Sequence, residues 1–525
     1  MEIRKFLLFA GSFIFVATGC TSGNKNSVEG AEAAAADSIA LPVVIEHLPD
    51  TVYPSASKVT FIVEVPDTTV SGFIEPLNDL YSSSSSIMTF RQGLKREADF
   101  NGRVDSIPTT LEVAWRFDTA LDRSDTVYGP WGGGSGWTGQ PLYVVWPDSL
   151  ASKLKASGAV GDEFDGKEIM IGSLCGSVYF LNPATGKETR PSIPVGNPIK
   201  GTPSFDPTFN GFLYVGQGTP ARRPFGALVV DLFKNNIIDF FPEDPKAQRR
   251  WGAYDSSPLR VGRFVFRPGE NGSLYKYTVL PDGIRLHSVL RYKVNGAAPG
   301  MESSMAIFAN YGYVTDNHGN VVCINLDNLR PVWRYTLGDD TDSSPVIVVE
   351  DGVPFIYVGC EIDRVARGYA NFAKLNGLTG EEVWCLKAEG KRREQGTKHF
   401  DGGFYATALP GQGDCEHLIF TNLVKNTSGQ NGSFLAINRS DGTIAYELPL
   451  KCYSWSSPAG ILAPGDKFIV INCDGAGNMY LIDGKSGKVI TSARIGKNFE
   501  SSPLVVGNSV FIGSRGNGIY KVNLK

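Results

Sequence analysis

Short runs of apolar residues, separated by turn residues, recur along most of the chain. The segment 303–337, SSMAIFANYGYVTDNHGNVVCINLDNLRPVWRYTL, contains four such runs. Short apolar runs bounded by turn residues are typical of buried β-strands. Glycine, asparagine and aspartate stand between the runs, where they allow tight turns. The segment therefore predicts four short antiparallel strands, which is one blade of a β-propeller.

The same unit recurs along the chain and can be recognised by its opening. An acidic residue followed by Ser-Ser-Pro introduces the first run in the clearest copies, and related sequences introduce the others. The eight openings begin at Thr138, Lys200, Asp255, Glu302, Asp342, Asp401, Trp455 and Glu500. Repeats of this kind predict a propeller in which each unit is one blade. We expect an all-β fold, an eight-bladed β-propeller of four-stranded antiparallel blades over residues 111–525.

The last unit lacks a fourth run, because the chain ends at Lys525 after three of them. The missing strand is predicted near the start of the propeller. Trp115 followed by Arg-Phe matches Trp333 followed by Arg-Tyr in an internal fourth strand. We expect residues 111–119 to form the outer strand of the last blade, with Trp115 as a structural closure residue. Such closure removes an open strand edge.

The residues before the repeats have a different composition. Two basic residues and a short apolar run precede Cys20, and the run is too short to span a bilayer comfortably. The pattern resembles a bacterial lipoprotein signal, with residues 1–19 as signal peptide and Cys20 as the lipidation site. Residues 20–40 are small and polar and predict a lipidated flexible tether. Residues 41–110 form an N-terminal extension whose structure the sequence does not define, apart from one strand at 59–65.

Charge and motif content narrow the classes of function. The net charge of −4 argues against nucleic acid as a partner, because phosphate binding needs a basic surface. HExxH, GxSxG and GxxxxGK[ST] do not occur, and no catalytic residue is assigned. The chain has eight cysteines but no CxxC motif and no adjacent pair. We expect the cysteines of the repeats to be small buried apolar residues.

The repeats resemble the PQQ-like propeller superfamily, and Phe90-Arg91, Arg96 and Trp115 resemble the lead-in of many such chains. One branch comprises quinoprotein dehydrogenases, which bind pyrroloquinoline quinone and calcium. Another comprises BamB-type lipoproteins, which are scaffolds for outer-membrane protein assembly. The lipoprotein signal, eight blades and closing strand resemble the second branch. This resemblance implies a monomeric, non-catalytic scaffold without cofactor or metal. It would be lipid-anchored in the outer membrane, on the periplasmic side or at the cell surface, and bind protein partners of the envelope.

Two alternatives remain open. A quinoprotein dehydrogenase is disfavoured by the missing cysteine pair and by the spacing at 316–320 and 473–478, which does not match a calcium loop. A carbohydrate-binding module is suggested by Trp131 and Trp137, which flank the glycine-rich run 132–136. Alternatively, that run has only a structural role and lets the chain turn from the closing strand into the first blade.

One cluster of polar residues is predicted from the repeat itself. The residues that introduce each innermost strand should crowd one mouth of the central channel, and five of the eight are acidic. Like charges gathered at one place attract cations or a basic loop of a partner. Alternatively, each acid caps its own turn without a shared ligand. The candidate channel-mouth binding residues are Asp255, Glu302, Asp342, Asp401, Trp455 and Glu500.

Overall fold

The computed structural model describes most of the chain from residue 47 onwards. The described residues are 47–525 except 76–78, 83–84, 99–101, 125–129, 137–138, 223, 396–397 and 428–429, and the side chains of 395, 398 and 399 are also not described. The predicted signal peptide, Cys20 and the tether lie outside this part of the chain.

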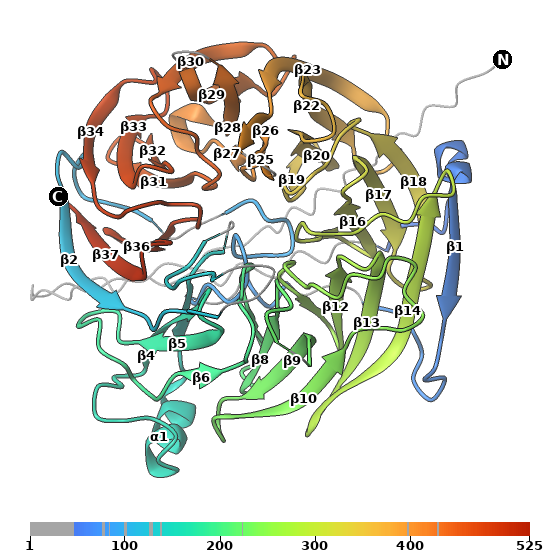
Figure 1. Cartoon of the computed structure of the whole chain (residues 1–525), viewed down its shortest axis with the longest axis horizontal. Coiled ribbons are helices and arrows are strands. Elements are labelled where there is room, and N and C mark those ends of the chain that lie inside the picture. The colour runs from blue at the N-terminus through green and yellow to red at the C-terminus, as the bar shows by residue number, and fades with distance from the viewer. Residues whose placement is uncertain are drawn as a thin grey trace, which may run out of the picture. The chain divides into compact units, whose positions relative to one another are not determined.

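Eight antiparallel sheets surround a central axis, each with its first strand innermost (Figure 1). The predicted eight-bladed propeller is therefore confirmed. Blade 1 contains β3 (Leu142–Val145), β4 (Lys167–Gly172), β5 (Ser177–Leu181) and β6 (Ile193–Pro194). Blade 2 contains β7 (Ser204–Phe205), β8 (Phe212–Gly216), β9 (Gly226–Asp231) and β10 (Asn236–Pro242). Blade 3 contains β11 (Leu259–Val261), β12 (Phe264–Gly269), β13 (Ser273–Leu280), β14 (Gly283–Val294) and an added outer strand, β1 (Val59–Glu64). Blade 4 contains β15 (Ala306–Phe308), β16 (Tyr311–Thr315), β17 (Asn320–Asn325) and β18 (Arg330–Thr336).

The second half of the ring follows the same plan. Blade 5 contains β19 (Val346–Glu350), β20 (Val353–Gly359), β22 (Arg367–Asn376) and β23 (Glu382–Lys391). Blade 6 contains β27 (Leu409–Pro410), β28 (Leu418–Thr427), β29 (Gln430–Asn438) and β30 (Ile444–Leu450), and β21 (Glu361–Ile362) and β26 (Gly402–Gly403) extend its sheet. Blade 7 contains β31 (Ala459–Ala463), β32 (Lys467–Cys473), β33 (Asn478–Asp483) and β34 (Val489–Arg494). Blade 8 contains β35 (Leu504–Val506), β36 (Ser509–Gly513), β37 (Gly518–Leu524) and β2 (Leu111–Asp118).

Few elements lie outside the blades. They are the helix α1 (Asp148–Ala156), the 3-10 turns η1 (Pro54–Lys58) and η2 (Gly413–Cys415), and the small hairpin of β24 (Arg393–Gln395) and β25 (Lys398–Phe400). In the described part of the chain, no helix has the length and apolar character needed to cross a membrane. The seven cysteines there are all free thiols. Cys323, Cys360, Cys415 and Cys473 are buried as expected, whereas Cys175, Cys385 and Cys452 are only half-buried, which corrects the expectation for these three.

Strands from both ends of the chain close the ring. β2 pairs with β37 in antiparallel register from Leu111 opposite Leu524 to Asp118 opposite Gly518. The predicted closing strand is thus confirmed, and blade 8 is completed from the N-terminal side. Trp115 is only half-buried, and its ring packs on blade 1, where its indole N–H donates to the carbonyl of Pro183 at 3.1 Å.

This contact of an outer-strand aromatic residue recurs between blades. Each ring lies over a glycine in the turn before the fourth strand of the next blade. A Cβ on that glycine would come within 2.5–2.6 Å of the ring, and the glycine has a φ of 72–75°, which side chains disfavour. The repeated turn glycine is therefore required both by conformation and by packing. The pairs are Trp115 with Gly186, Trp333 with Gly380, Trp384 with Gly442, and Tyr446 with Gly487.

The Ser-Ser-Pro landmark has a structural role at the inner end of each blade. The second hydroxyl residue accepts a hydrogen bond from the backbone N–H of its counterpart in the preceding blade. Each hydroxyl thus satisfies a backbone donor that the inner strand cannot pair within its own sheet. The links run from Ser257 to Ser304, Ser304 to Ser344, Ser344 to Thr407, Thr407 to Ser457 and Ser457 to Ser502, at 2.9–3.2 Å.

These links correct one predicted opening. In blade 6 the hydroxyl of Thr407 occupies the place of the second serine. The residue equivalent to Asp255 or Glu302 is therefore Tyr405, and not Asp401 as the sequence suggested. Asp401 precedes the short strand β26. The two glycines that follow Asp401 resemble the small residues at the start of other blades, which explains the wrong prediction.

The N-terminal extension lies on the outside of the ring before it enters the channel. Tyr53 donates its backbone N–H to Val332 of blade 4 at 2.8 Å, and β1 pairs along the whole of its length with β14 of blade 3. The strand predicted at 59–65 is thus present, and it makes blade 3 five-stranded.

Farther along, residues 86–98 and 102–104 fill the central channel, and we call these residues the plug. Its backbone carbonyls accept hydrogen bonds from inner-strand N–H groups of several blades. Such groups would otherwise be buried without a partner. The contacts are Tyr143 to Ile87, Phe205 to Met88, Ile307 to Leu94, Ile347 to Lys95 and Leu462 to Gly102, at 2.7–2.9 Å.

Two fully buried arginines attach the plug to the remaining inner strands. Arg91 donates to the carbonyls of Pro458 and Ala408, at 3.0 and 2.6 Å. Arg96 donates to the carbonyls of Met305 and Ser257, at 2.8 and 2.7 Å. Burial lowers the pKa of both guanidinium groups to about 9, so they remain cationic at neutral pH. Their planar, multiple donors match carbonyls from different blades in a way that a lysine cannot.

Trp115→Ala should destabilise the ring by about 2 kcal/mol, less than a fully buried tryptophan would. The ring packs on Gly186 of the next blade, so its loss loosens the seam between blades 8 and 1. Urea unfolding measures the effect. Val113→Ala is the control, because Val113 lies on the same strand with 44% of its surface exposed. Equal stability of the two variants would contradict the closure role.

Arg96→Met should destabilise by at least about 3 kcal/mol, because it leaves buried carbonyls of two blades without donors. Arg96→Lys should recover only a small part of this loss. Arg103→Ala is the matched control from the same plug, since the Arg103 side chain is 73% exposed. Thermal unfolding of the three variants measures the differences. A melting temperature of Arg96→Met close to that of Arg103→Ala would show that the plug does not hold the ring.

Candidate functional site

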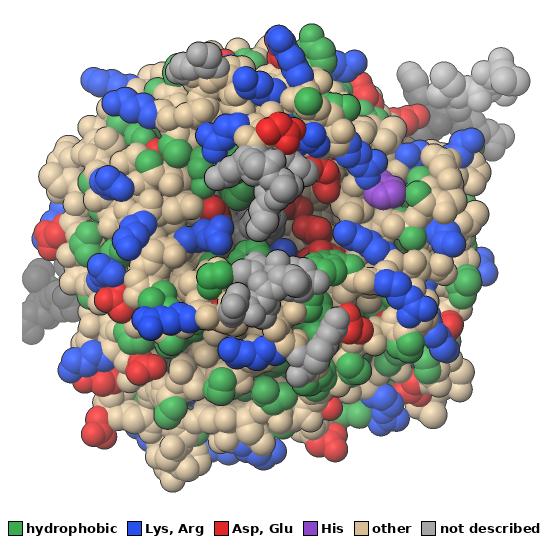
Figure 2. Space-filling model, viewed as in Figure 1, with side chains coloured by type: hydrophobic (Ala, Val, Ile, Leu, Met, Phe, Trp, Pro, Cys, Tyr) green, Lys and Arg blue, Asp and Glu red, His purple; other side chains and the backbone are tan. Residues whose placement is uncertain are grey.

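Acidic side chains gather at one mouth of the channel, above the plug. Figure 2 shows carboxylate side chains in the hollow at the centre of this face. Six carboxylates belong to the group, which we call the acidic mouth. They fall into two triads whose ligand atoms lie within 4.8 Å of one another, namely Asp255, Glu270 and Glu302, and Asp340, Asp342 and Glu361.

The first triad is built by blades 2 to 4 around one lysine. The ammonium group of Lys200 contacts Asp255 and lies 3.9 Å from Glu270 Oε1. Trp251 donates its indole N–H to Glu270 Oε2 at 2.6 Å. Asp255 Oδ1 accepts no hydrogen bond from the residues that the structure describes. One ammonium thus faces three carboxylates.

The second triad comes from the turn before blade 5 and from β21, which lies between β20 and β22 in the chain and joins the sheet of blade 6. The backbone N–H of Asp342 donates to Glu361 Oε1 at 3.0 Å. Asp340 turns the chain by accepting the N–H of Thr341 at 2.6 Å. Glu302 and Asp342 interact directly, so the two triads form one continuous array.

A small cavity lies where the triads meet. Its volume is about 20 Å³. Its lining combines carboxylates with hydroxyls of the inner ring, and Phe90 of the plug lies beside them. The lining residues are Phe90, Gly201, Thr202, Asp255, Glu302, Ser304, Asp342 and Ser344.

Burial and mutual repulsion govern ionisation in the mouth. Burial, with the charge of neighbouring carboxylates, raises the pKa of Asp342, Glu361 and Glu270 well above the usual range. Burial is also the largest single effect on Glu302, but the positive charge of Lys200, together with hydrogen bonds from Glu270 and Asp342, outweighs it and lowers the pKa of Glu302. The mouth therefore holds protons that a solvated cluster would release, and its negative potential is weaker than six separate charges would give.

The predicted mouth residues do not all share one cluster. Asp255, Glu302 and Asp342 meet at the cavity. Glu500 is bound by Arg515 at 3.2 Å and by Asn498 at 2.9 Å, so it forms a separate ion pair.

The remaining two lie in an aromatic group beside the mouth. Trp455 is stacked between Phe400 and Tyr405, with ring centroids 4.5 and 4.6 Å apart. Asp401 accepts a hydrogen bond from the hydroxyl of Tyr405 at 3.2 Å. A role of these residues in binding stays a prediction.

Three members of the mouth were missed from the sequence: Glu270, Asp340 and Glu361. Glu270 follows Gly269 at the end of β12, and Glu361 lies two positions after Gly359, the end of β20. The second strand of a blade ends at the same mouth at which the first strand begins. An acidic residue just after a second strand therefore indicates a side chain at this mouth, and Glu270 and Glu361 could have been predicted in this way.

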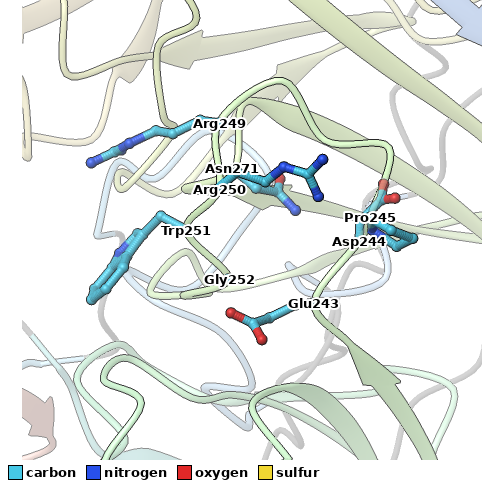
Figure 3. Close-up of a pocket in the computed structure, with 8 residues that line it drawn as sticks. All are labelled: Glu243, Asp244, Pro245, Arg249, Arg250, Trp251, Gly252 and Asn271. Carbon is cyan, nitrogen blue, oxygen red and sulfur yellow. The ribbon is translucent and has the colours of Figure 1, made fainter.

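A pocket of about 280 Å³ lies next to the first triad. It is formed by the loop between blades 2 and 3, and Figure 3 shows Arg249 and Trp251 extending away from Asp244 and Pro245. Arg249 Nη1 donates to the carbonyl of Glu270 at 3.1 Å. The loop thus stabilises the rim of the mouth through hydrogen bonds to the backbone carbonyl and the carboxylate of Glu270.

The glycine-rich run suggested for sugar binding is packed inside the molecule. A Cβ on Gly134 would lie 1.7 Å from the carbonyl of Ser514, and one on Gly133 would lie 2.3 Å from that of Ala120. Close backbone approach therefore explains these glycines. Trp131 lies under the guanidinium of Arg515 at 5.5 Å, and Trp137 is outside the described residues.

Comparisons with known proteins agree with this architecture. No family model matches the sequence, and no curated protein matches it. Among solved structures, a europium-containing methanol dehydrogenase has a TM-score of 0.53 at 13% identity, over 85% of this chain and 99% of the other. A quinohemoprotein alcohol dehydrogenase from Comamonas testosteroni has a TM-score of 0.54 at 12% identity, over 84% of this chain and 80% of the other. BamB from Moraxella catarrhalis has a TM-score of 0.46 at 13% identity, over 68% and 93%.

Likeness at such low identity concerns the fold and leaves the activity open. The blade count, the strand order and the closing strand all agree with the resemblance read from the repeats. In its fold the chain is an eight-bladed β-propeller.

Proposed function

We propose that the protein is a non-catalytic scaffold of the outer membrane, held by a lipid on Cys20, that binds protein partners of the cell envelope. The observation that carries this proposal is the plug. The residues of the plug occupy the channel, and their polar groups are used in binding the inner strands. Interaction with other molecules is then left to the outer surfaces of the ring.

The alternative of a quinone enzyme requires room for the cofactor. Ligand sites in proteins usually enclose about 300–1,000 Å³. The cavity at the mouth has about 20 Å³ and is bounded by Phe90 of the plug. The acidic mouth therefore does not have room for pyrroloquinoline quinone.

One hairpin near the acidic mouth offers a surface for a partner. The hairpin of β22 and β23 begins just after Glu361 of the acidic mouth. Tyr369 is 64% exposed, and Val365, just before β22, is 49% exposed. Tyrosine contributes strongly to protein interfaces because it has a large apolar ring and a polar tip. We place the first partner contact on this hairpin.

The test is site-specific photo-crosslinking in intact cells, with a photoreactive phenylalanine at position 369. We expect an adduct of discrete mass with an envelope protein. Position 444 is the matched control, because Ile444 is also exposed but lies on the outer strand of blade 6. Cys20→Ser should move the protein to the soluble fraction and reduce the adduct. Equal adducts from both positions would indicate random collision and count against the hairpin.

A parallel assay separates scaffold from enzyme. Purified protein is supplied with quinone, calcium and an electron-accepting dye, and oxidation of alcohols and sugars is followed. We expect no turnover above the level of the same protein unfolded by heat. Saturable dye reduction would overturn the proposal and favour a quinoprotein dehydrogenase.

A further inference from the structure

The N-terminal extension carries a concentration of exposed apolar side chains. Fourteen large apolar side chains are well exposed in the described part of the chain, and five of them lie within residues 52–73. Exposed apolar residues that are scattered singly are normal, whereas a group of them marks a contact with another molecule. We call this group the apolar patch, and its members, with exposures of 42–60%, are Val52, Phe61, Ile62, Val65 and Phe73.

The patch lies on the outer wall of blades 3 and 4. Phe61 and Ile62 belong to β1, which pairs with β14 and lies outside it (Figure 1). The patch begins next to Tyr53, whose backbone N–H donates to a carbonyl of β18 in blade 4. It ends next to Ile74, whose backbone N–H donates at 2.8 Å to Asp327 Oδ1, in the turn between β17 and β18. The segment therefore leaves blade 4, crosses blade 3 and returns, so its exposed side chains share one wall.

This wall presents little unbalanced charge. Residues 52–73 contain only three charged residues, namely Lys58, Glu64 and Asp67. Glu64 is paired with Lys246 at 3.2 Å, and Asp67 lies 3.7 Å from Arg285. A surface whose carboxylates are paired is easier to remove from water than one with isolated charges. The wall therefore suits an apolar partner better than a highly charged one.

The chain enters the described structure beside the patch. His47 is the first described residue, and its ring stacks on Phe73 with the two centroids 4.5 Å apart. Cys20 lies 27 positions earlier in the sequence. A flexible chain of that length has a root-mean-square end-to-end distance of about 30 Å. A lipid on Cys20 would therefore keep this wall within reach of the bilayer.

We propose that the apolar patch contacts the surface of the lipid bilayer that holds the Cys20 anchor. The proposal rests on the lipid anchor of the proposed function and adds a second point of attachment to it. Phe61, Ile62 and Phe73 enter the boundary between head groups and acyl chains. They go no deeper, because β1 is the outermost strand described for its sheet, and backbone groups on such an edge need water or head groups as partners.

Photo-crosslinking in reconstituted vesicles tests the proposal. The protein purified from cells, with a photoreactive phenylalanine at position 61 or 73, is incorporated into vesicles of phosphatidylethanolamine and phosphatidylglycerol that contain a labelled phospholipid. We expect labelled protein from both positions. Position 444 is the matched control, because Ile444 has the same exposure as Phe61, 42%, but lies on the outer strand of blade 6. Equal labelling from position 444 would indicate non-specific contact and overturn the proposal.

Mass spectrometry of the same samples reports acylation of Cys20, which separates the patch from the anchor. Acylation without lipid labelling at positions 61 and 73 would overturn the contact of the patch and leave the anchor standing. Labelling without acylation would support the contact and overturn the anchor. An adduct with twice the mass of the chain would show that a second copy covers the patch, which also counts against the proposal.

A charged variant provides a second test. Phe61→Asp with Ile62→Asp should lower the labelling from position 73 at least about tenfold, because carboxylates replace apolar side chains on the contact surface. Both positions are exposed, so the melting temperature should stay close to that of the unaltered protein. Ile444→Asp is the control and should leave the labelling unchanged. Full labelling in a folded double variant would overturn the proposal, and Ile62→Asp alone serves if the double variant does not fold.

Discussion

The structure depends on satisfying backbone groups along the inner edges of the blades. Closing a propeller into a ring leaves the first strand of every blade facing the axis with one unpaired edge. Buried N–H and C=O groups without partners are among the costliest features a fold can have. The plug supplies carbonyls to the N–H groups, and Arg91 and Arg96 supply donors to carbonyls. Two cations buried at the axis are tolerable because each guanidinium is surrounded by acceptors.

The same arrangement explains why the acidic mouth lies above a closed channel. Backbone N–H groups of the Ser-Ser-Pro motifs bind hydroxyls of the next blade, which draws the preceding residues into one narrow ring. Where those residues are acidic, the ring geometry forces carboxylates together and away from water. Repulsion and burial then raise several of their pKa values. An array that costs free energy in this way is consistent with a role other than stability.

The sequence predicted the features that rest on local repetition. Blade number, closing strand and the aromatic residue of the outer strand could be read directly, because Trp115 and Trp333 carry the same local pattern. The plug could not be predicted, because its partners are inner strands of many blades and its own residues have no strand or helix periodicity. Asp401 was predicted to introduce blade 6, because Gly402 and Gly403 follow it as small residues do at other blade openings. The hydrogen bonds show instead that Thr407 occupies the place of the second serine. Glu270 and Glu361 were not predicted, because the repeated landmark precedes only the first strand of each blade and these two residues follow second strands.

Plug and closing strand are parts of one continuous segment. Val104 is still bound to the inner strand of blade 7, and Thr109 already donates to the last residue of the chain. The few residues between them can span at most about 3.5 Å each, so the two attachments cannot separate far. Opening the seam of blade 8 therefore pulls on the plug, and displacing the plug strains the seam. The N-terminal segment thus makes the ring cooperative, because closure at its rim and filling of its axis are coupled through a short stretch of the same chain.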